Sequence, residues 1–161
     1  MSSSPPESPQ APDDHHPIMP PFVLLGHLVA QGVLHLTVSG PQLFSGAANA
    51  LGLVFIVSGI AMVLSIASAF SREHTTILPL QVSDQLVTGG LFEYSRNPIY
   101  LGMTTILLGF ALFLGSATPM LIVPIFPWWI GRNIIVHEER MLEERFGDAY
   151  RNYKQRVRRW I

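Results

Sequence analysis

The chain has 161 residues, of which 48% are hydrophobic and 13% are charged, so its length allows one domain and its composition is more apolar than that of an average soluble protein. It has a formal net charge of -1 and no cysteine, which excludes disulfides, thiolate catalysis and cysteine metal sites. No Asp, Glu, Lys or Arg lies between Asp14 and Arg72, or between Arg96 and Arg132. Both gaps are long enough to hold transmembrane helices.

The amino-terminal segment is rich in Pro and Ser. Seven of the 13 prolines occur in the first 21 residues, a composition typical of disorder. We therefore expect residues 1–19 to be a disordered tail and residues 20–161 to form one membrane domain. No basic region precedes the first apolar stretch, and that stretch continues into further apolar sequence, so we expect no cleaved signal peptide.

The two charge-free stretches predict four membrane spans, because each span needs about 20 mainly apolar residues. An even number of spans places both termini on the same side of the membrane. Every Lys and Arg lies in residues 71–97 or 132–161, and the positive-inside rule assigns such segments to the cytoplasm. The predicted spans are about 20–38, 47–70, 98–114 and 119–136, with short turns at Ser39-Gly40-Pro41 and at Gly115-Ser116-Ala117-Thr118-Pro119.

Two groups of residues within the predicted spans are unusual for apolar helices. His27 and His35 lie in the first span, about 80° apart around a helix, which is too far for a tight pair of metal ligands. We expect both to be packed or interfacial. Pro119, Pro124 and Pro127 lie in the last span and predict a kink in it.

The carboxyl-terminal segment has the pattern of an amphipathic helix over about 137–158. We expect this helix to continue the last span or to bend from it near Gly147, and to lie either over the cytoplasmic mouth of the bundle or on lipid. Its acids precede its bases, an order that suits the helix dipole and also brings bases close to anionic lipid. The apolar residues that recur at three or four positions are Leu142, Phe146, Tyr150, Tyr153, Val157 and Trp160.

Polar motifs stand at both mouths of the second predicted hairpin. Thr88 to Gly102 includes the sequence Ser95-Arg96-Asn97-Pro98-Ile99-Tyr100-Leu101-Gly102, and Glu138 to Tyr153 begins with Glu138-Glu139-Arg140. In this order and spacing, the motifs resemble those of the isoprenylcysteine carboxyl methyltransferase and phospholipid methyltransferase superfamily, over about residues 75–161. The resemblance implies an integral membrane enzyme that uses S-adenosylmethionine (SAM), in a pocket built from the last spans and the tail helix.

The chain departs from the family pattern at two places. It has Arg96-Asn97-Pro98 where the carboxyl methyltransferases typically have Arg-His-Pro, and it lacks the proline that usually follows the arginine-valine pair, here Arg156-Val157. The acceptor is therefore left open, and carboxylate, thiol and amine acceptors all remain candidates.

SAM carries a sulfonium, an ammonium, a carboxylate and an adenosine, so its pocket needs acids, a base or backbone donors, and an apolar or aromatic slot. Glu138 and Glu139 are candidates for the ammonium or the ribose hydroxyls, with Glu139 the first choice. Adjacent helical residues point about 100° apart, so the two glutamates would contact different parts of one ligand. An exposed charged helix face is the competing interpretation of this pair.

The first motif supplies the remaining candidates for cofactor binding. Arg96 would bind the cofactor carboxylate, and Asn97 and Pro98 would start a helix whose free amides face a polar ligand. Tyr100 would flank adenine, and Gly102 would let the ligand or a neighbouring helix approach. Interfacial anchoring, capping and packing explain the same residues in membrane helices without a ligand.

Methyl transfer is an in-line displacement at a carbon that the sulfonium already activates, so the protein mainly aligns the reactants and excludes water. We expect no metal and no nucleic acid; the expected partners are membrane lipid and a small lipophilic acceptor. Arg151 and Arg156 are the candidate catalytic residues, because either could hold an acidic acceptor. Both also suit contact with phospholipid heads.

The sequence thus predicts an all-α integral membrane bundle of about four transmembrane helices with a carboxyl-terminal amphipathic cytoplasmic helix. We expect SAM-dependent methyl transfer to a lipophilic or membrane-delivered small acceptor, at the cytoplasmic face of a bacterial inner membrane. The alternative is a non-catalytic membrane protein with the same fold, either a small transporter subunit or a scaffold. The predicted spans carry no Asp or Glu, and Arg132 near the end of the last span is their only Lys or Arg. This pattern and the lack of an internal repeat disfavour transport, and the paired motifs disfavour a scaffold.

Overall fold

The computed structural model describes residues 19–38, 40–72 and 86–161, so nearly all of the predicted disordered tail lies outside the described residues. The described residues form helices, and the prediction of an all-α membrane bundle is confirmed. The elements in chain order are α1 (Pro20–Thr37), α2 (Ala47–Arg72), the 3-10 turn η1 (Gly90–Glu93), α3 (Pro98–Leu114), α4 (Ala117–Ile122), α5 (Ile125–Ile130), the π-helical segment η2 (Gly131–Ile135), α6 (Val136–Phe146) and α7 (Asp148–Arg156).

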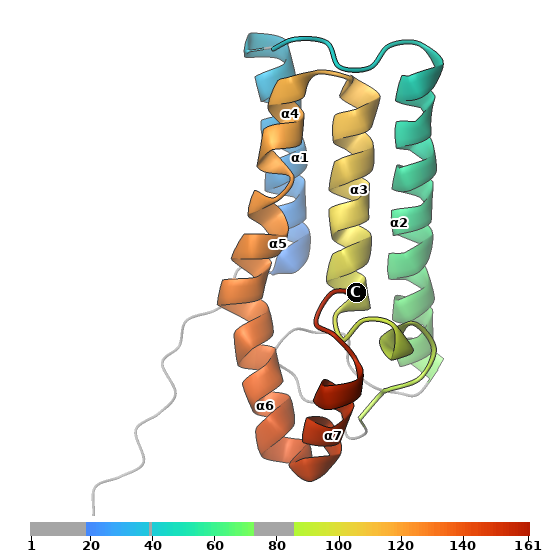
Figure 1. Ribbon diagram of the computed structural model, residues 1–161, viewed down its shortest axis with the longest axis vertical. Helices are drawn as coiled ribbons and strands as arrows, with labels where there is room; N and C mark the ends of the chain where they lie inside the picture. The colour runs from blue at the N-terminus through green and yellow to red at the C-terminus, as the bar shows by residue number, and fades with distance from the viewer. Residues whose placement is uncertain (1–18, 39, 73–85) are drawn as a thin grey trace, which may run out of the picture.

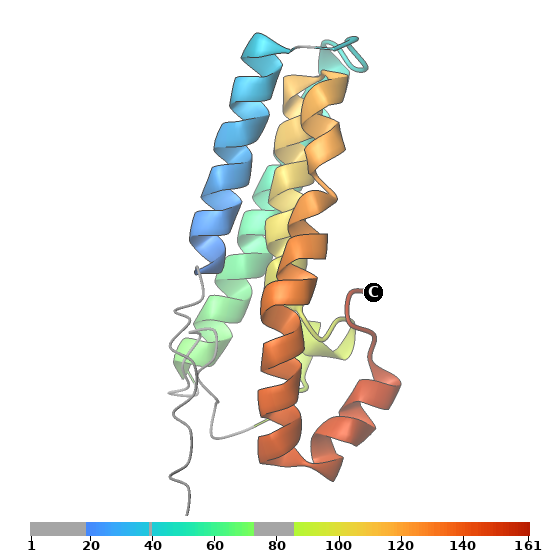
Figure 2. The ribbon, with the colours of Figure 1, turned by 90° about the vertical axis from the view of Figure 1, so that its left-hand side faces the viewer.

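The helices run side by side along one long axis. Figure 1 shows α2 beside α3, while α4, α5 and α6 follow one another in a single column. Figure 2 shows α7 folding back beside α6 at the end opposite the turns that join α1 to α2 and α3 to α4. The chain reverses at Gly147, whose φ of 51° favours glycine. The tail helix therefore bends near Gly147, which was one of the two predicted alternatives.

Within the described residues, three helices are long and apolar enough to cross a membrane, over Pro20–Thr37, Ala47–Phe70 and Ala117–Phe146, and α3 is a shorter apolar helix between them in sequence. Apolar side chains cover their outer faces, as expected when lipid is the neighbour. The last of these stretches includes the whole of α6, and α6 carries charged residues. The polar part of the molecule therefore begins within α6.

Glycines bring α2 and α3 into backbone contact. A Cβ atom on Gly52 would lie 2.5 Å from the Gly109 carbonyl oxygen, and one on Gly59 would lie 2.6 Å from the Gly102 carbonyl oxygen. Each helix carries its two glycines seven residues apart, so both contacts fall on one seam. Gly102 thus faces a neighbouring helix, which was one of its two predicted roles. The seam fixes the amino-terminal end of α3, where the first polar motif lies.

The break between α4 and α5 follows from Pro124, which has no N–H to donate to the Met120 carbonyl. The Val123 N–H donates to that carbonyl instead, at 3.3 Å, and the Pro119 carbonyl accepts from Gln31 Nε2 at 3.3 Å. Gln31 is fully buried and also donates to the Leu107 carbonyl at 3.2 Å. The predicted kink is present, and a buried polar side chain of α1 stabilises it.

The two histidines of α1 lie on the same side as Gln31, one turn before it and one turn after it. His27 packs edge-on against Phe126, with ring centroids 5.4 Å apart, and its Nδ1 lies 2.9 Å from the Val23 carbonyl oxygen. His35 Nδ1 lies 2.8 Å from Ser116 Oγ. Both histidines are packed, as predicted.

The buried core joins α3 to the last column of helices, and side chains of α1 such as Leu24 and Leu28 pack against it. This core holds the amino-terminal end of α3 beside η2, which leads into α6 and the second polar motif. Its buried members are Tyr100, Met103, Leu107, Phe126, Ile130, Ile134 and Ile135.

Candidate functional site

The polar site begins where α3 starts. Pro98 occupies the first turn, as predicted, and Asn97 stands at the N-cap position. The Asn97 side chain does not cap the helix; its Nδ2 donates to the Arg159 carbonyl at 3.0 Å. Sequence reasoning assigned Asn97 to the cap, and the structure instead uses its amide to hold the end of the chain.

Residues 157–161 follow α7 and lie along the loop before α3; we call them the C-terminal strap. The Arg96 N–H donates to the Arg158 carbonyl at 2.9 Å, and Ser95 Oγ donates to the Arg159 carbonyl at 3.2 Å. Trp160 packs against the core. These contacts attach the strap to the first polar motif through its backbone.

The strap brings Arg159 to Glu139, which α6 presents from the other side. Arg159 Nε donates to Glu139 Oε1 at 3.0 Å and Arg159 Nη2 donates to Oε2 at 2.6 Å, in a bidentate pair that raises the pKa of Arg159. Arg96 Nη1 forms an ion pair with Glu139 Oε1 at 3.2 Å. The three side chains come from segments more than 19 residues apart in sequence and form one charged cluster. Their relative exposures are 9% for Arg96, 8% for Glu139 and 38% for Arg159.

Arg96 is only partly satisfied in this cluster. Its Nε and Nη1 are buried and make no hydrogen bond to any described residue. A guanidinium is permanently charged and carries five N–H donors, so burying Nε without a partner and Nη1 with only an ion pair is costly. Arg96 therefore has donor capacity left for a further acceptor.

Tyr150 completes the cluster from α7. Its side chain is 1% exposed, and burial together with the Glu139 charge raises its pKa to about 12, while Arg96 and Arg159 act in the opposite direction. The neighbouring Tyr153 is also buried, its pKa is likewise raised by burial to about 12, and its hydroxyl donates to the Phe92 carbonyl at 2.7 Å. Both phenols are therefore protonated at neutral pH and can serve as hydrogen-bond donors.

Glu138 has a separate partner. Its Oε1 accepts a hydrogen bond from the Tyr100 hydroxyl at 2.8 Å, so it faces α3 while Glu139 faces Arg96 and the strap. The two adjacent glutamates thus point to different places, as the helical geometry requires. Four of the predicted cofactor residues, Arg96, Tyr100, Glu138 and Glu139, meet where α3, α6 and the strap converge.

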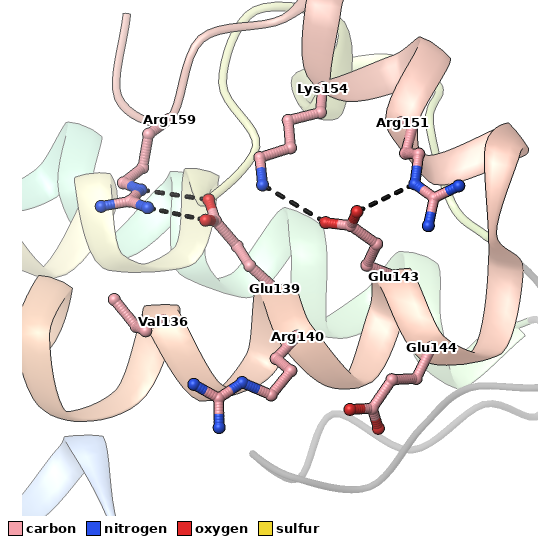
Figure 3. Close-up of a pocket in the computed structure, with 8 residues that line it drawn as sticks. All are labelled: Val136, Glu139, Arg140, Glu143, Glu144, Arg151, Lys154 and Arg159. Carbon is pink, nitrogen blue, oxygen red and sulfur yellow. Dashed lines mark hydrogen bonds and ion pairs between the residues drawn. The ribbon is translucent and has the colours of Figure 1, made fainter.

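A pocket of about 530 Å³ lies between α6 and α7, with Glu139 and Arg159 in its wall (Figure 3). Glu143 accepts hydrogen bonds from Arg151 at 2.9 Å and from Lys154 at 3.4 Å across this pocket. Figure 3 shows the remaining charged residues of the wall, Arg140 and Glu144, directed away from α7. The lining residues are Val136, Glu139, Arg140, Glu143, Glu144, Arg151, Lys154 and Arg159.

The two predicted catalytic arginines lie on α7. Arg151 lines the pocket, its side chain is 57% exposed, and the hydrogen bonds that it donates to Glu143 and Asp148 raise its pKa. Arg156 is exposed, and its Nε donates to the Asn152 carbonyl at 3.4 Å. The structure thus brings Arg151 to the pocket and leaves Arg156 on the outer surface of the helix.

Sequence reasoning missed three contributors to the site. Tyr150 was assigned only to an apolar stripe, Ser95 to a motif without a role, and Arg159 to a basic end that suits lipid. Ser95 belongs to the first quoted motif, but Arg159 lies beyond the second, and the two residues that contact each other are 64 positions apart. Helical spacing predicts that Tyr150 lies on the buried face of its helix, but it does not predict which charged side chains lie beside the phenol.

Comparison with known proteins identifies the family in which these motifs occur. The family model for phospholipid methyltransferases matches residues 47–149. An uncharacterised protein of Haemophilus influenzae is 48% identical over 63 residues, covering 39% of this chain and all of that protein. The protein-S-isoprenylcysteine O-methyltransferase of Schizosaccharomyces pombe is 28% identical over 109 residues, covering 68% of this chain and 46% of that enzyme.

Among solved structures, the eukaryotic intramembrane Ras methyltransferase known as isoprenylcysteine carboxyl methyltransferase matches with a TM-score of 0.62. The identity is 21%, and the match covers 89% of this chain and 52% of that protein, so it shows a shared fold. The chain thus spans about half the length of both named methyltransferases. The predicted superfamily resemblance is confirmed: the chain is a multi-pass integral membrane protein and belongs to the phospholipid methyltransferase family.

Proposed function

We propose that this protein is a SAM-dependent methyltransferase that acts on a lipophilic or membrane-delivered small acceptor. Family membership supports methyl transfer. The observation that carries the proposal is the buried Arg96, whose Nε and Nη1 have no hydrogen-bond partner among the described residues and lie beside Glu139. We propose that the cofactor site is formed by the start of α3, by α6 and by the C-terminal strap.

The chemistry of the cluster fits the cofactor. Two arginines surround one glutamate, so the cluster has a formal charge of +1 and lacks an anion. The carboxylate of SAM would supply that anion and accept from the free Arg96 donors, in a charge-assisted contact. Glu139 and Glu138 would receive the ammonium and the ribose hydroxyls, because each can accept several hydrogen bonds.

Three of the other predicted cofactor residues would support the site without contacting the ligand. Pro98 starts α3 and fixes its first turn, Asn97 holds the strap, and Gly102 packs against α2. Tyr100 holds Glu138 by a hydrogen bond and lies in the buried core, where its ring would form an apolar wall. The proposal therefore assigns ligand contact to Arg96, Tyr100, Glu138 and Glu139.

When bound, SAM supplies a methyl group on a sulfonium, which needs no further activation. The chain's own residues would orient the ligand, exclude water and admit an acceptor. Arg151 and Arg156 remain the proposed contacts for an acidic acceptor, and Arg151 already faces the pocket. Carboxylate, thiol and amine acceptors are all compatible with this site.

We propose a bacterial inner membrane location with the α6–α7 end in the cytoplasm, because the basic residues gather there.

One observation favours the competing function, a non-catalytic membrane protein with this fold. Glu139 is already paired with two arginines, which is also how a purely structural buried ion pair is built. A structural pair predicts that the folded protein binds neither SAM nor its demethylated product, S-adenosylhomocysteine.

The test is calorimetric titration of the detergent-purified protein with both ligands. We expect binding by the wild type, and hydrogen bonds to charged groups contribute about 1.5–3 kcal/mol, so Arg96→Gln should weaken it by about 10- to 100-fold. Arg158→Gln is the matched control, because the Arg158 side chain is exposed and only its carbonyl contacts the site. If Arg96→Gln does not fold, Glu138→Gln takes its place. Absence of binding to the folded wild type, in detergent and in lipid, would establish the non-catalytic alternative.

A further inference from the structure

The carboxylate that we propose as a ligand contact is already occupied by a side chain of the same protein. Arg159 donates to both oxygens of Glu139, at 3.0 and 2.6 Å. Arg96 adds an ion pair to Oε1 at 3.2 Å. A carboxylate has about four lone-pair sites, so these contacts use most of its capacity. A ligand ammonium could reach Glu139 fully only after one arginine has moved.

The two arginines differ in their freedom to move. The Arg96 side chain is 9% exposed, whereas that of Arg159 is 38% exposed and lines the pocket of about 530 Å³. The strap that carries Arg159 is held by its backbone, because the carbonyls of Arg158 and Arg159 accept from the Arg96 N–H and from Ser95 and Asn97. The Arg159 side chain can therefore turn into the pocket while the strap stays in place.

Charge makes this movement depend on the ligand. The cluster of Arg96, Glu139 and Arg159 has a formal charge of +1. SAM also has a net charge of +1, because it carries a sulfonium and an ammonium with one carboxylate. S-adenosylhomocysteine lacks the sulfonium charge and is neutral overall. Like charges repel strongly in a partly buried site, so Arg159 beside Glu139 penalises the cationic ligand more than the neutral one.

We propose that Arg159 is a charge-selecting residue of this site, which competes with ligand cations for Glu139 and turns into the pocket between α6 and α7 when SAM binds. The inference rests on the proposed cofactor site. It assigns to Arg159 a specificity role, in which the residue lowers affinity for the cationic methyl donor relative to the neutral product. The C-terminal strap is then a fixed support that carries one movable side chain.

The test compares two ligands that differ by one charge. Arg159→Met keeps a long apolar stem and removes the charge, so we expect SAM affinity to rise by about fivefold to tenfold. The affinity of S-adenosylhomocysteine, which has the same ammonium and no sulfonium, should rise less, by about twofold. Arg159→Lys keeps the charge and should retain most of the wild-type discrimination between the ligands. Arg158→Met, on the same strap, should leave both affinities unchanged. Weaker binding of both ligands to Arg159→Met would overturn the inference, because Arg159 would then hold the ligand.

A second readout separates side-chain movement from opening of the strap. Because the Arg96 N–H donates to the Arg158 carbonyl, hydrogen exchange at Arg96 reports on strap attachment. We expect its protection to persist when SAM binds, and a loss of protection would show that the whole strap opens. A folded wild type that binds neither ligand would contradict the proposed function itself. Wild-type binding with an unchanged ligand ratio in Arg159→Met would contradict this inference alone.

Discussion

The seam between α2 and α3 and the cluster around Glu139 hold the molecule together in different ways. At the seam, glycines allow backbone contact and no charged side chain takes part. At the cluster, side chains and the strap are joined by ion pairs and by hydrogen bonds to backbone carbonyls. Apolar surface gains little by leaving lipid, so the seam depends on close fit, whereas the cluster depends on charge and polar geometry. The comparison assigns fold stability mainly to the seam, and the cluster is the place of the proposed ligand recognition.

The largest effect should come from filling the seam. Gly59→Leu places side-chain atoms where a Cβ alone would lie 2.6 Å from the Gly102 carbonyl oxygen. The helices must then separate, and we expect a loss of about 3 kcal/mol in the free energy of unfolding. Thermal unfolding in detergent measures it. Gly26→Leu on α1 is the control, because a Cβ there meets nothing within 4 Å. Equal melting temperatures for the two variants would show that the seam is not the main support.

A smaller effect should come from releasing the strap. Asn97→Ala removes the hydrogen bond to the Arg159 carbonyl, while Ser95 still donates to it, so we expect a loss of about 1 kcal/mol in stability. The bonds after Arg158 and Arg159 should also become more accessible to trypsin, which mass spectrometry detects. Asn152→Ala, on the exposed side of α7, should change neither quantity. Unchanged trypsin cleavage in Asn97→Ala would mean that other contacts hold the strap.

A third effect concerns pH and sharpens the account of the cluster. The pKa of Tyr150 is about 12 in the folded protein, against an ordinary value of 10.0. The unfolded chain therefore loses this proton first, and stability falls as the pH rises above 10, by at most about 1.4 kcal/mol per pH unit for one group. Tyr150→Phe should flatten this decline in melting temperature between pH 9 and pH 11. An unchanged slope would assign the alkaline sensitivity to Tyr153 or to other groups.

The sequence predicts the bundle well, because lipid imposes long apolar segments that composition alone reveals. It also predicts that the two polar motifs lie near each other, since one hairpin separates them. Arg96, Tyr100, Glu138 and Glu139 converge as that argument requires.

The sequence does not predict which residues complete the site. Asn97, Arg159 and Tyr150 each contact residues from distant segments, and such contacts depend on the bend at Gly147 and on the path of the strap. Local patterns assign Asn97 to a helix cap and Tyr150 to an apolar stripe, because capping and burial are local properties. The charge partners of these residues are set by tertiary packing.

The π-helical segment η2 has a consequence for the phase of the helix that follows it. A π turn holds about one residue more than an α turn, and each residue of α6 advances by about 100° around the axis. If the same five residues, Gly131–Ile135, formed an α turn instead, every later side chain would advance by about 100° into the place of its successor, so that Glu138 would stand where Glu139 now meets Arg96. Glu139 would then turn away from Arg96 without any substitution. The identity of the acid at the heart of this cluster is thus a matter of angular register as much as of composition.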